Sequence, residues 1–253
     1  MIAAILQKTG DLHALRIFYF KIDAVIVVIA YLLGSIPFGY LVGRARGIDI
    51  RKHGSGNIGA TNVLRTLGKP AGIFVFICDA AKGLAAVLIG KHFAASHGFE
   101  MVNPGAPLEL YFEFLPPAVA AISAGVACIL GHNFPVWLKF KGGKGIATSA
   151  GVLLGMMWQA VLVCLIVWAA VFYATGYVSL ASILAAISLP VVVLVLLCFT
   201  SLLTGWPLFY FAVVVAVLAV WRHRANIGRL LAGTESRFGG AAKKSEHEFP
   251  PHE

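Results

Sequence analysis

Charged residues are scarce in this sequence. Only 12% of the 253 residues are charged and 59% are hydrophobic, with a mean hydropathy of +0.86, whereas an average soluble domain is about a quarter charged. A soluble fold of this length could not bury so much apolar surface. The composition therefore excludes soluble globular, coiled-coil, collagen-like and disordered chains. It predicts an all-α polytopic membrane protein.

Cysteine patterns with a chemical role are also lacking. The chain has four cysteines, and each lies inside an apolar run without a CxxC or Cys/His spacing. We expect them to pack as small core residues. A disulfide-stapled domain, a metal site and a redox cofactor are not predicted. The four positions are Cys78, Cys128, Cys164 and Cys198.

The basic residues are unevenly distributed. Lysine and arginine number 20 against 11 acidic residues, for a net charge of +9. Fifteen of the 20 lie in segments 44–69, 139–144 and 222–244. The positive-inside rule explains these segments as cytoplasmic, and anion binding would use the same charges. None could form a basic domain large enough for nucleic acid, so the bilayer is the expected macromolecular environment.

The apolar runs predict the topology. A spanning helix needs about 20 apolar residues, and single runs of this kind cover 23–42, 71–90, 115–131, 178–200 and 207–221. The run 146–173 must cross outward and return, with a break near 155–159, if all three basic segments are cytoplasmic. The sequence thus predicts seven transmembrane helices, with the N-terminus outside and the C-terminus cytoplasmic. We expect one domain, with its core at 22–238, an N-terminal arm at 1–21 and a disordered tail at 239–253.

Segment 53–65 is the first polar candidate. Its three glycines, at 54, 56 and 59, allow positive φ angles, so backbone N–H groups can converge into an anion-binding nest. The segment is predicted to end in a helix N-terminus, which is itself an anion site. The alternative is an ordinary polar turn between membrane helices. Its candidate phosphate ligands are Ser55, Gly56, Asn57, Thr61, Asn62 and Arg65.

Segment 131–145 is the second polar candidate for an anion-binding site. Gly142, Gly143 and Lys144 bring bare backbone and one ammonium group to the start of a helix, and all three are candidate phosphate ligands. The spacing is not that of a Walker A loop. Lys139 and Lys141 are expected to mark only the membrane interface. His132 and Asn133 are interpreted as helix-capping residues.

Segment 221–235 is the third polar candidate. His223 and Asn226 are spaced i, i+3 and share one helical face, whereas Arg222, Arg224 and Arg229 are expected to point to water or lipid headgroups. The alternative is an amphipathic helix attracted to anionic lipid.

Two further features lie in the predicted membrane helices. Ser179 opens the run 178–200 as either a cap or a ligand donor. Asp79 and Lys82 form an i, i+3 pair that is either a functional site or a structural ion pair.

Taken in this order, the three segments resemble the motifs of the bacterial acyl-phosphate:glycerol-3-phosphate acyltransferases (the PlsY family), as do 34–39 and 177–182. The resemblance covers about 25–238. It implies seven helices in the bacterial inner membrane and a site facing the cytoplasm. It also implies transfer of a fatty acyl group from acyl phosphate to the 1-hydroxyl of glycerol 3-phosphate, without a cofactor. The acyl-phosphate-producing enzyme is an implied partner.

Carried over by motif, the candidate catalytic residues are His223, Asn226 and Ser179, and the remaining candidates would bind phosphate. No His-x4-Asp signature of acyl-CoA-dependent glycerolipid acyltransferases and no Gly-x-Ser-x-Gly elbow is present. The rival interpretation is a transporter for a phosphorylated anion. Its site would be expected near the midplane between repeats, whereas the polar segments here gather at one face.

The proton of the attacking hydroxyl has two predicted acceptors. A neutral His223 could act as general base. Alternatively the leaving phosphate takes the proton, and His223 with Asn226 orients the hydroxyl. We expect the second route, because acyl phosphate is already an activated donor.

Overall fold

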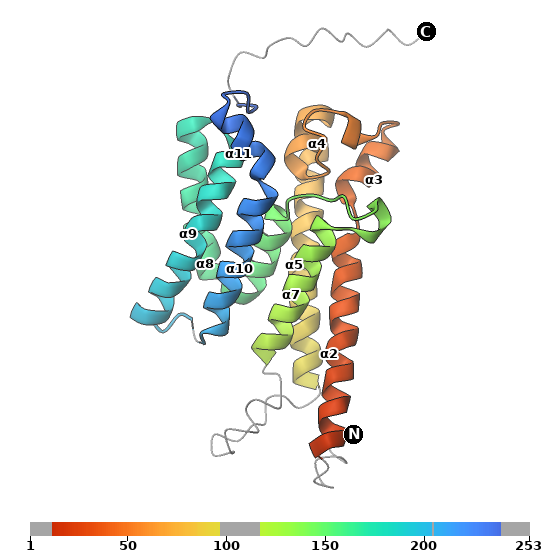
Figure 1. Cartoon of the computed structure of the whole chain (residues 1–253), viewed down its shortest axis with the longest axis vertical. Coiled ribbons are helices and arrows are strands. Elements are labelled where there is room, and N and C mark those ends of the chain that lie inside the picture. The colour runs from red at the N-terminus through yellow and green to blue at the C-terminus, as the bar shows by residue number, and fades with distance from the viewer. Residues whose placement is uncertain (1–11, 97–116, 204, 239–253) are drawn as a thin grey trace.

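The computed structural model describes residues 12–96, 117–203 and 205–238. Within these ranges every regular element is helical (Figure 1). The α-helices and the two 3₁₀ turns, η1 and η3, are α2 (Leu12–Ser35), α3 (Phe38–Ala45), η1 (Ile50–Lys52), α4 (Ala60–Leu67), α5 (Lys69–Ser96), α7 (Pro117–Asn133), η3 (Val136–Leu138), α8 (Ile146–Thr175), α9 (Val178–Phe199), α10 (Pro207–Arg222) and α11 (Arg224–Leu231).

Five helices among the described residues are long and apolar enough to cross a membrane. The number rises to six if α10 and α11, which meet at an angle of 55°, form one bent span. The predicted all-α membrane class is therefore confirmed. The predicted tail 239–253 and residues 1–11 of the arm lie outside the described residues, as do residues 97–116 between α5 and α7.

The predicted span over 23–42 lies within one candidate membrane span, Asp23–Ala45, but its helix is interrupted before Phe38, at Pro37. Helix α2 ends at Ser35 and α3 begins at Phe38. Proline has no N–H to donate, and its ring disfavours helical geometry at the preceding residue. The break leaves the Ile36 carbonyl available to a side chain, and it accepts a hydrogen bond from Lys82 Nζ at 2.9 Å.

The predicted break at 155–159 is confirmed at Met157, whose φ of −150° and ψ of 62° divide α8 into two helical halves. Ile146 in the first half and Phe172 in the second line the same cavity. A straight helix would separate them by roughly 39 Å, so the second half turns back. Lys91 Nζ donates to the Gly155 carbonyl beside the break, at 2.7 Å.

Small residues allow α5 and the first half of α8 to pack closely. A Cβ on Gly83 would collide with the Thr148 carbonyl, and one on Gly151 with the Ala80 carbonyl. Close approach through glycine is the usual way that membrane helices associate. Because residues 80 and 83 meet residues 151 and 148, this contact fixes the register of the two helices.

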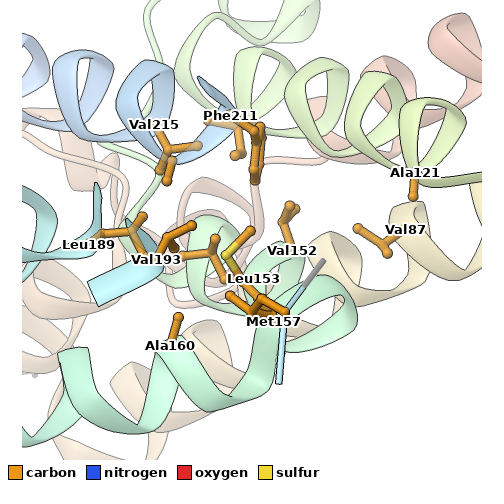
Figure 2. Close-up of a cluster of buried hydrophobic side chains, with 13 residues drawn as sticks. Val87, Ala121, Val152, Leu153, Met157, Ala160, Leu189, Val193, Phe211 and Val215 are labelled. Atoms are coloured by element: carbon orange, nitrogen blue, oxygen red, sulfur yellow. The ribbon is translucent and has the colours of Figure 1, made fainter. Parts of the chain in front are cut away.

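The main apolar core lies where α8 meets α9 and α10 (Figure 2). Met157 at the break is fully buried there, in one cluster with Val193 of α9 and Phe211 of α10. This packing leaves α4 and α11 together at the end of the bundle opposite the start of α2 (Figure 1). The polar segments meet at that end.

Candidate active site

A cavity of about 630 Å³ is lined by residues from all three polar segments. The predicted site residues that line it are Ser55, Asn57, Thr61, Asn62, Arg65, Lys144, Ser179, His223 and Asn226. Gly56, Gly142 and Gly143 are not among the lining residues. The structure thus brings together segments that are more than 150 residues apart in the sequence, from position 55 to position 226.

Three helix N-termini open into this cavity. Its wall includes the first residues of α4 (Ala60 and Thr61), of α8 (Ile146 and Ala147) and of α9 (Val178 and Ser179). First-turn N–H groups have no partner inside their own helix, and the helix dipole adds partial positive charge there. Convergence of three such ends gives the cavity the positive potential and the N–H donors that suit an anion. The predicted helix start within segment 53–65 is confirmed by α4.

Asn62 shapes the first loop rather than contacting the cavity with free donors. Its Oδ1 accepts from Ser55 N at 2.9 Å, and its Nδ2 donates to the carbonyls of Asn57 at 2.8 Å and His53 at 3.1 Å. These bonds use the polar atoms of a side chain that is only 3% exposed. The predicted phosphate contact of Asn62 is therefore corrected to a role in holding the loop.

Gly56 also shapes this loop. Its φ is +69°, and its N–H donates to the His53 carbonyl at 3.0 Å. A side chain would be strained at this φ, which explains the glycine without a phosphate contact. Asn57 Oδ1 accepts from Gly59 N at 2.7 Å, a turn that leads into α4. The hydroxyl groups of Ser55 and Thr61 bond to no described residue and line the cavity.

Arg65 reaches the cavity from the last turn of α4. Its Nη2 donates to the Ser236 carbonyl at 3.0 Å, and its guanidinium carbon lies 4.6 Å from the centre of the Phe238 ring. Burial lowers the pKa of Arg65, against the opposing charge of Glu235. An arginine held in this way presents its remaining donors in a fixed orientation, as phosphate recognition requires.

Lys144 lies between the second loop and α8. Burial is the main cause that lowers the pKa of Lys144 to about 8, and the charges of Arg229, Arg65 and Arg222 add to it against that of Glu235. A desolvated ammonium close to other cations gains strongly from a bound anion. Lys144 therefore has the position and the charge for a phosphate ligand.

Gly142 and Gly143 do not offer their N–H groups to the cavity, which corrects the prediction made for them. Their N–H groups donate to the carbonyls of Asn133 at 3.2 Å and His132 at 3.1 Å. A Cβ on either glycine would collide with segment 132–135. The glycines are needed for close packing, and this packing places Lys144.

Arg222 points inward to the same loop, so the prediction that it faces water or lipid headgroups is wrong. Its Nη2 donates to the Gly142 carbonyl at 2.9 Å and its Nε to the Gly143 carbonyl at 3.0 Å. The planar guanidinium group matches two adjacent carbonyls. Arg222 thus connects α10 to the loop that carries Lys144.

Glu235 organises the side of the cavity formed by α9 and α11, and sequence reasoning missed it. Its Oε1 accepts from Ser179 Oγ and Asn226 Nδ2, both at 2.7 Å, and its Oε2 pairs with Arg229 Nε at 2.7 Å. Burial raises the pKa of Glu235, but these hydrogen bonds and Arg229 outweigh it, so the pKa is lowered overall. The only signal in the sequence was an acidic residue inside a basic segment.

His223 and Asn226 lie together in the cavity wall, as their spacing predicts. His223 is 2% exposed and Asn226 is 4% exposed. His223 Nδ1 lies 2.7 Å from the Ala219 carbonyl, which can only accept, so Nδ1 carries the proton and a neutral ring leaves Nε2 as an acceptor. Asn226 Oδ1 is buried without a partner among the described residues. The pair therefore offers two acceptors to a bound hydroxyl compound.

The cavity also has an apolar part. Trp168 and Phe172 of α8 stack with ring centres 5.0 Å apart and line it opposite Ile73 and Phe76 of α5. Ile73 is 54% exposed and Phe76 49% exposed, so the apolar part of the cavity is not closed off by these two side chains. Among the described residues no group of three or more His, Cys, Asp or Glu side chains could hold a metal ion.

Known proteins of one family are similar to this chain. The sequence model of the glycerol-3-phosphate acyltransferase family matches residues 24–233. A protein of that name from Desulforudis audaxviator is 47% identical over 218 residues, covering 85% of this chain and 96% of the relative. Another, from Mesorhizobium japonicum, is 44% identical over 214 residues, covering 84% and 94%.

Two solved structures are also similar to this chain. The glycerol 3-phosphate form of PlsY (YgiH), an integral membrane glycerol 3-phosphate acyltransferase, is 39% identical with a TM-score of 0.70, and the match covers 86% of this chain and 96% of that one. Its lysophosphatidic acid form is 38% identical with a TM-score of 0.69, at 86% and 95% coverage. The chain therefore belongs to the glycerol-3-phosphate acyltransferase family.

Proposed function

We propose that this acyltransferase moves a fatty acyl group from acyl phosphate to the 1-hydroxyl of glycerol 3-phosphate, giving lysophosphatidate and phosphate. The observation that carries the proposal is the convergence of three helix N-termini with Arg65, Lys144 and Arg229 in one cavity. Two phosphate-bearing substrates must lie side by side in such a reaction. Their combined negative charge needs cations and N–H groups from several elements.

The apolar part of the cavity fits the fatty chain. The acyl group would enter from the bilayer between Ile73 and Phe76 on one side and Trp168 and Phe172 on the other. Its phosphate would then reach the helix N-termini, while glycerol 3-phosphate arrives from the aqueous side. Burial of the chain against aromatic rings supplies binding free energy, and the phosphate contacts fix the position of the carbonyl carbon.

In the reaction, the 1-hydroxyl oxygen of glycerol 3-phosphate attacks the acyl carbonyl carbon, and the bond from that carbon to the phosphate oxygen breaks. His223 Nε2 and Asn226 Oδ1 are suited to accept hydrogen bonds from the two glycerol hydroxyls, because each acceptor is free of described partners. We propose that the leaving phosphate takes the proton. An unprotonated Nε2 would also allow His223 to act as the general base. Variants of His223 distinguish proton transfer to the phosphate from proton transfer to His223.

The donor test uses purified protein with glycerol 3-phosphate and either acyl phosphate or the matching acyl-CoA. We expect lysophosphatidate and phosphate from acyl phosphate without added metal, and no product from acyl-CoA. The Lys144→Ala protein measures the background. Equal turnover with acyl-CoA would refute the donor assignment while leaving the acyltransferase activity in place.

We further propose that the core 22–238 is one domain with seven membrane crossings in the bacterial inner membrane. On this proposal the N-terminus is outside, and the cavity faces the cytoplasm. Helix α8 then supplies two crossings, because its second half returns after Met157. The basic loops around the cavity agree with a cytoplasmic location. This location would also give access to a soluble acyl-phosphate-producing enzyme, which is the proposed partner.

The orientation can be tested with an impermeant thiol reagent on intact cells. In a background without the four native cysteines, Ser96→Cys at the outer end of α5 should be labelled from outside. Thr66→Cys in α4 should react only after the membrane is opened. Labelling of Thr66→Cys in intact cells would invert the proposed topology.

Arg222 provides a test of how the second loop is held. Arg222→Lys keeps the charge but can no longer donate to the Gly142 and Gly143 carbonyls in parallel, so we expect kcat/KM to fall by roughly 10- to 100-fold. Arg224→Lys is the matched control, because among the described residues Arg224 donates only to the Trp221 carbonyl, at 3.3 Å, and stacks on the Trp221 ring. Wild-type kcat/KM in Arg222→Lys would show that Arg222 contributes only charge, and equal losses in both variants would show that the loss is not specific to the two carbonyl bonds.

A further inference from the structure

A buried polar cluster lies behind the loop that carries Lys144. Lys82 Nζ of α5 lies 2.8 Å from Asp79 Oδ1 and 3.0 Å from His132 Nδ1 of α7, and it donates to the Ile36 carbonyl at 2.9 Å. The three residues are at most 4% exposed. No step of the proposed reaction uses these three residues, although Asp79 and His132 line the cavity.

The environment of Lys82 determines the tautomer of His132. An ammonium group has donors and no acceptor. Lys82 Nζ donates to the Ile36 carbonyl, forms an ion pair with Asp79 Oδ1 at 2.8 Å and lies 3.0 Å from His132 Nδ1. Nδ1 must therefore present its lone pair to Lys82. His132 Nδ1 is also 3.4 Å from Asp79 Oδ1, but a proton on Nδ1 would point into the ammonium group at 3.0 Å. The ring is neutral, and its proton lies on Nε2.

The Nε2 edge of this ring faces the phosphate loop. Of the atoms that a Cβ on Gly143 would meet, His132 Nε2 is the nearest, so only glycine leaves room for it. No described residue accepts a hydrogen bond from Nε2, and His132 lines the cavity together with Lys144 and Gly145. An N–H donor in a cavity wall, without an acceptor among the described residues, indicates a ligand that accepts from it.

We propose that His132 is a neutral hydrogen-bond donor to the phosphate bound in this cavity, and that Asp79 and Lys82 are positioning residues that keep its donor on Nε2. The inference rests on the proposed function only in taking the bound anion to be a phosphate. The charges of Asp79 and Lys82 cancel. The cluster therefore orients the Nε2–H donor of His132 without adding net charge to a site already rich in cations.

The tautomer can be measured by nitrogen NMR on protein labelled with ¹⁵N-histidine, with His132→Asn identifying the signal among the eight histidines. We expect Nδ1 of His132 to be unprotonated and Nε2 protonated. Inorganic phosphate should shift the Nε2–H signal in a saturable manner. The double variant Asp79→Asn/Lys82→Met preserves the net charge of the cluster and should lose the fixed tautomer. A proton on Nδ1, or no shift at saturating phosphate, would overturn the proposal.

Phosphate affinity, measured by calorimetry, separates this role from a structural one. His132→Asn keeps an acceptor for Lys82 but is too short to reach the phosphate, so affinity should fall by roughly 10- to 100-fold. His132→Gln should recover part of the loss, because its amide reaches the Nε2 position. His92→Asn, at an exposed site on α5, is the control. Unchanged affinity in His132→Asn would refute the contact. Phosphate binding through His132 without acyl transfer would instead refute the proposed function.

Discussion

Replacing Lys144 or Arg65 by alanine should lower kcat/KM by roughly 100- to 1,000-fold, because a phosphate would be left facing too few cations in a desolvated site. Both side chains line the cavity, whereas Lys139 and Lys141 are exposed on the same loop region. Lys139→Ala and Lys141→Ala should change the rate less than about threefold. The measurement is steady-state acyl transfer by purified variants.

If all four variants lost activity to the same extent, the loops would act as a diffuse positive field, and the assignment of Lys144 and Arg65 would be wrong. Thermal unfolding in detergent provides the control for folding. Lys144→Arg keeps the charge, and it should retain more activity than Lys144→Ala.

The pH dependence gives Lys144 a separate signature. Its pKa is lowered to about 8 by burial and by the neighbouring guanidinium groups. The free enzyme therefore loses this positive charge as the pH rises through 8, and kcat/KM, which reports the free enzyme, should fall there. Lys144→Arg should move this decline to higher pH, because arginine stays charged. An unchanged alkaline limb in Lys144→Arg would assign the titration to another group.

The second large effect is expected at His223. His223→Ala should reduce kcat by roughly 100- to 1,000-fold, since it removes the Nε2 acceptor and the bond to the Ala219 carbonyl. His223→Asn can keep that backbone bond and some of the local geometry but cannot act as a base. If the leaving phosphate takes the proton, the Asn variant should be clearly faster than the Ala variant.

Equal and near-zero rates in two folded His223 variants would instead establish general-base catalysis. Loss of the acidic limb of the pH–rate profile in His223→Asn would support the same conclusion. Asn226→Ala in combination with His223→Ala should cost little more than the worse single variant, because residues that act as one unit are not additive.

Much of the fold was predictable because apolar run length and basic loops constrain a membrane chain strongly. The break in α8 followed from the need to return the chain to one side, and it occurs at Met157. The break at Pro37 was not predicted, although its cause is local. An apolar run with one proline can continue as a kinked helix or end, and hydropathy does not distinguish these outcomes.

The sequence predicts which residues form the candidate site better than it predicts the role of each residue. Glycines marked loops of unusual backbone geometry, but the sequence could not show where their N–H groups point. Those of Gly142 and Gly143 bond to the end of α7. Asn62 likewise has the chemistry of a phosphate ligand, and only the folded loop shows that its donors are used.

Arg222 and Glu235 were missed for a related reason. A basic residue near a membrane surface has a common explanation in lipid attraction, so nothing in the sequence separates Arg222 from Arg224. The partners that distinguish Arg222 are carbonyls about 80 positions away. The role of Glu235 likewise depends on Ser179, Asn226 and Arg229, which meet only when α9 and α11 pack.

The most direct test of the central claim is to measure chemistry and transport in one experiment. Liposomes containing the purified protein and acyl phosphate receive external glycerol 3-phosphate, and lysophosphatidate, released phosphate and internal glycerol 3-phosphate are measured together. We expect one phosphate per lysophosphatidate and no accumulation of glycerol 3-phosphate inside. Accumulation of glycerol 3-phosphate without lysophosphatidate would contradict the account and identify a transporter.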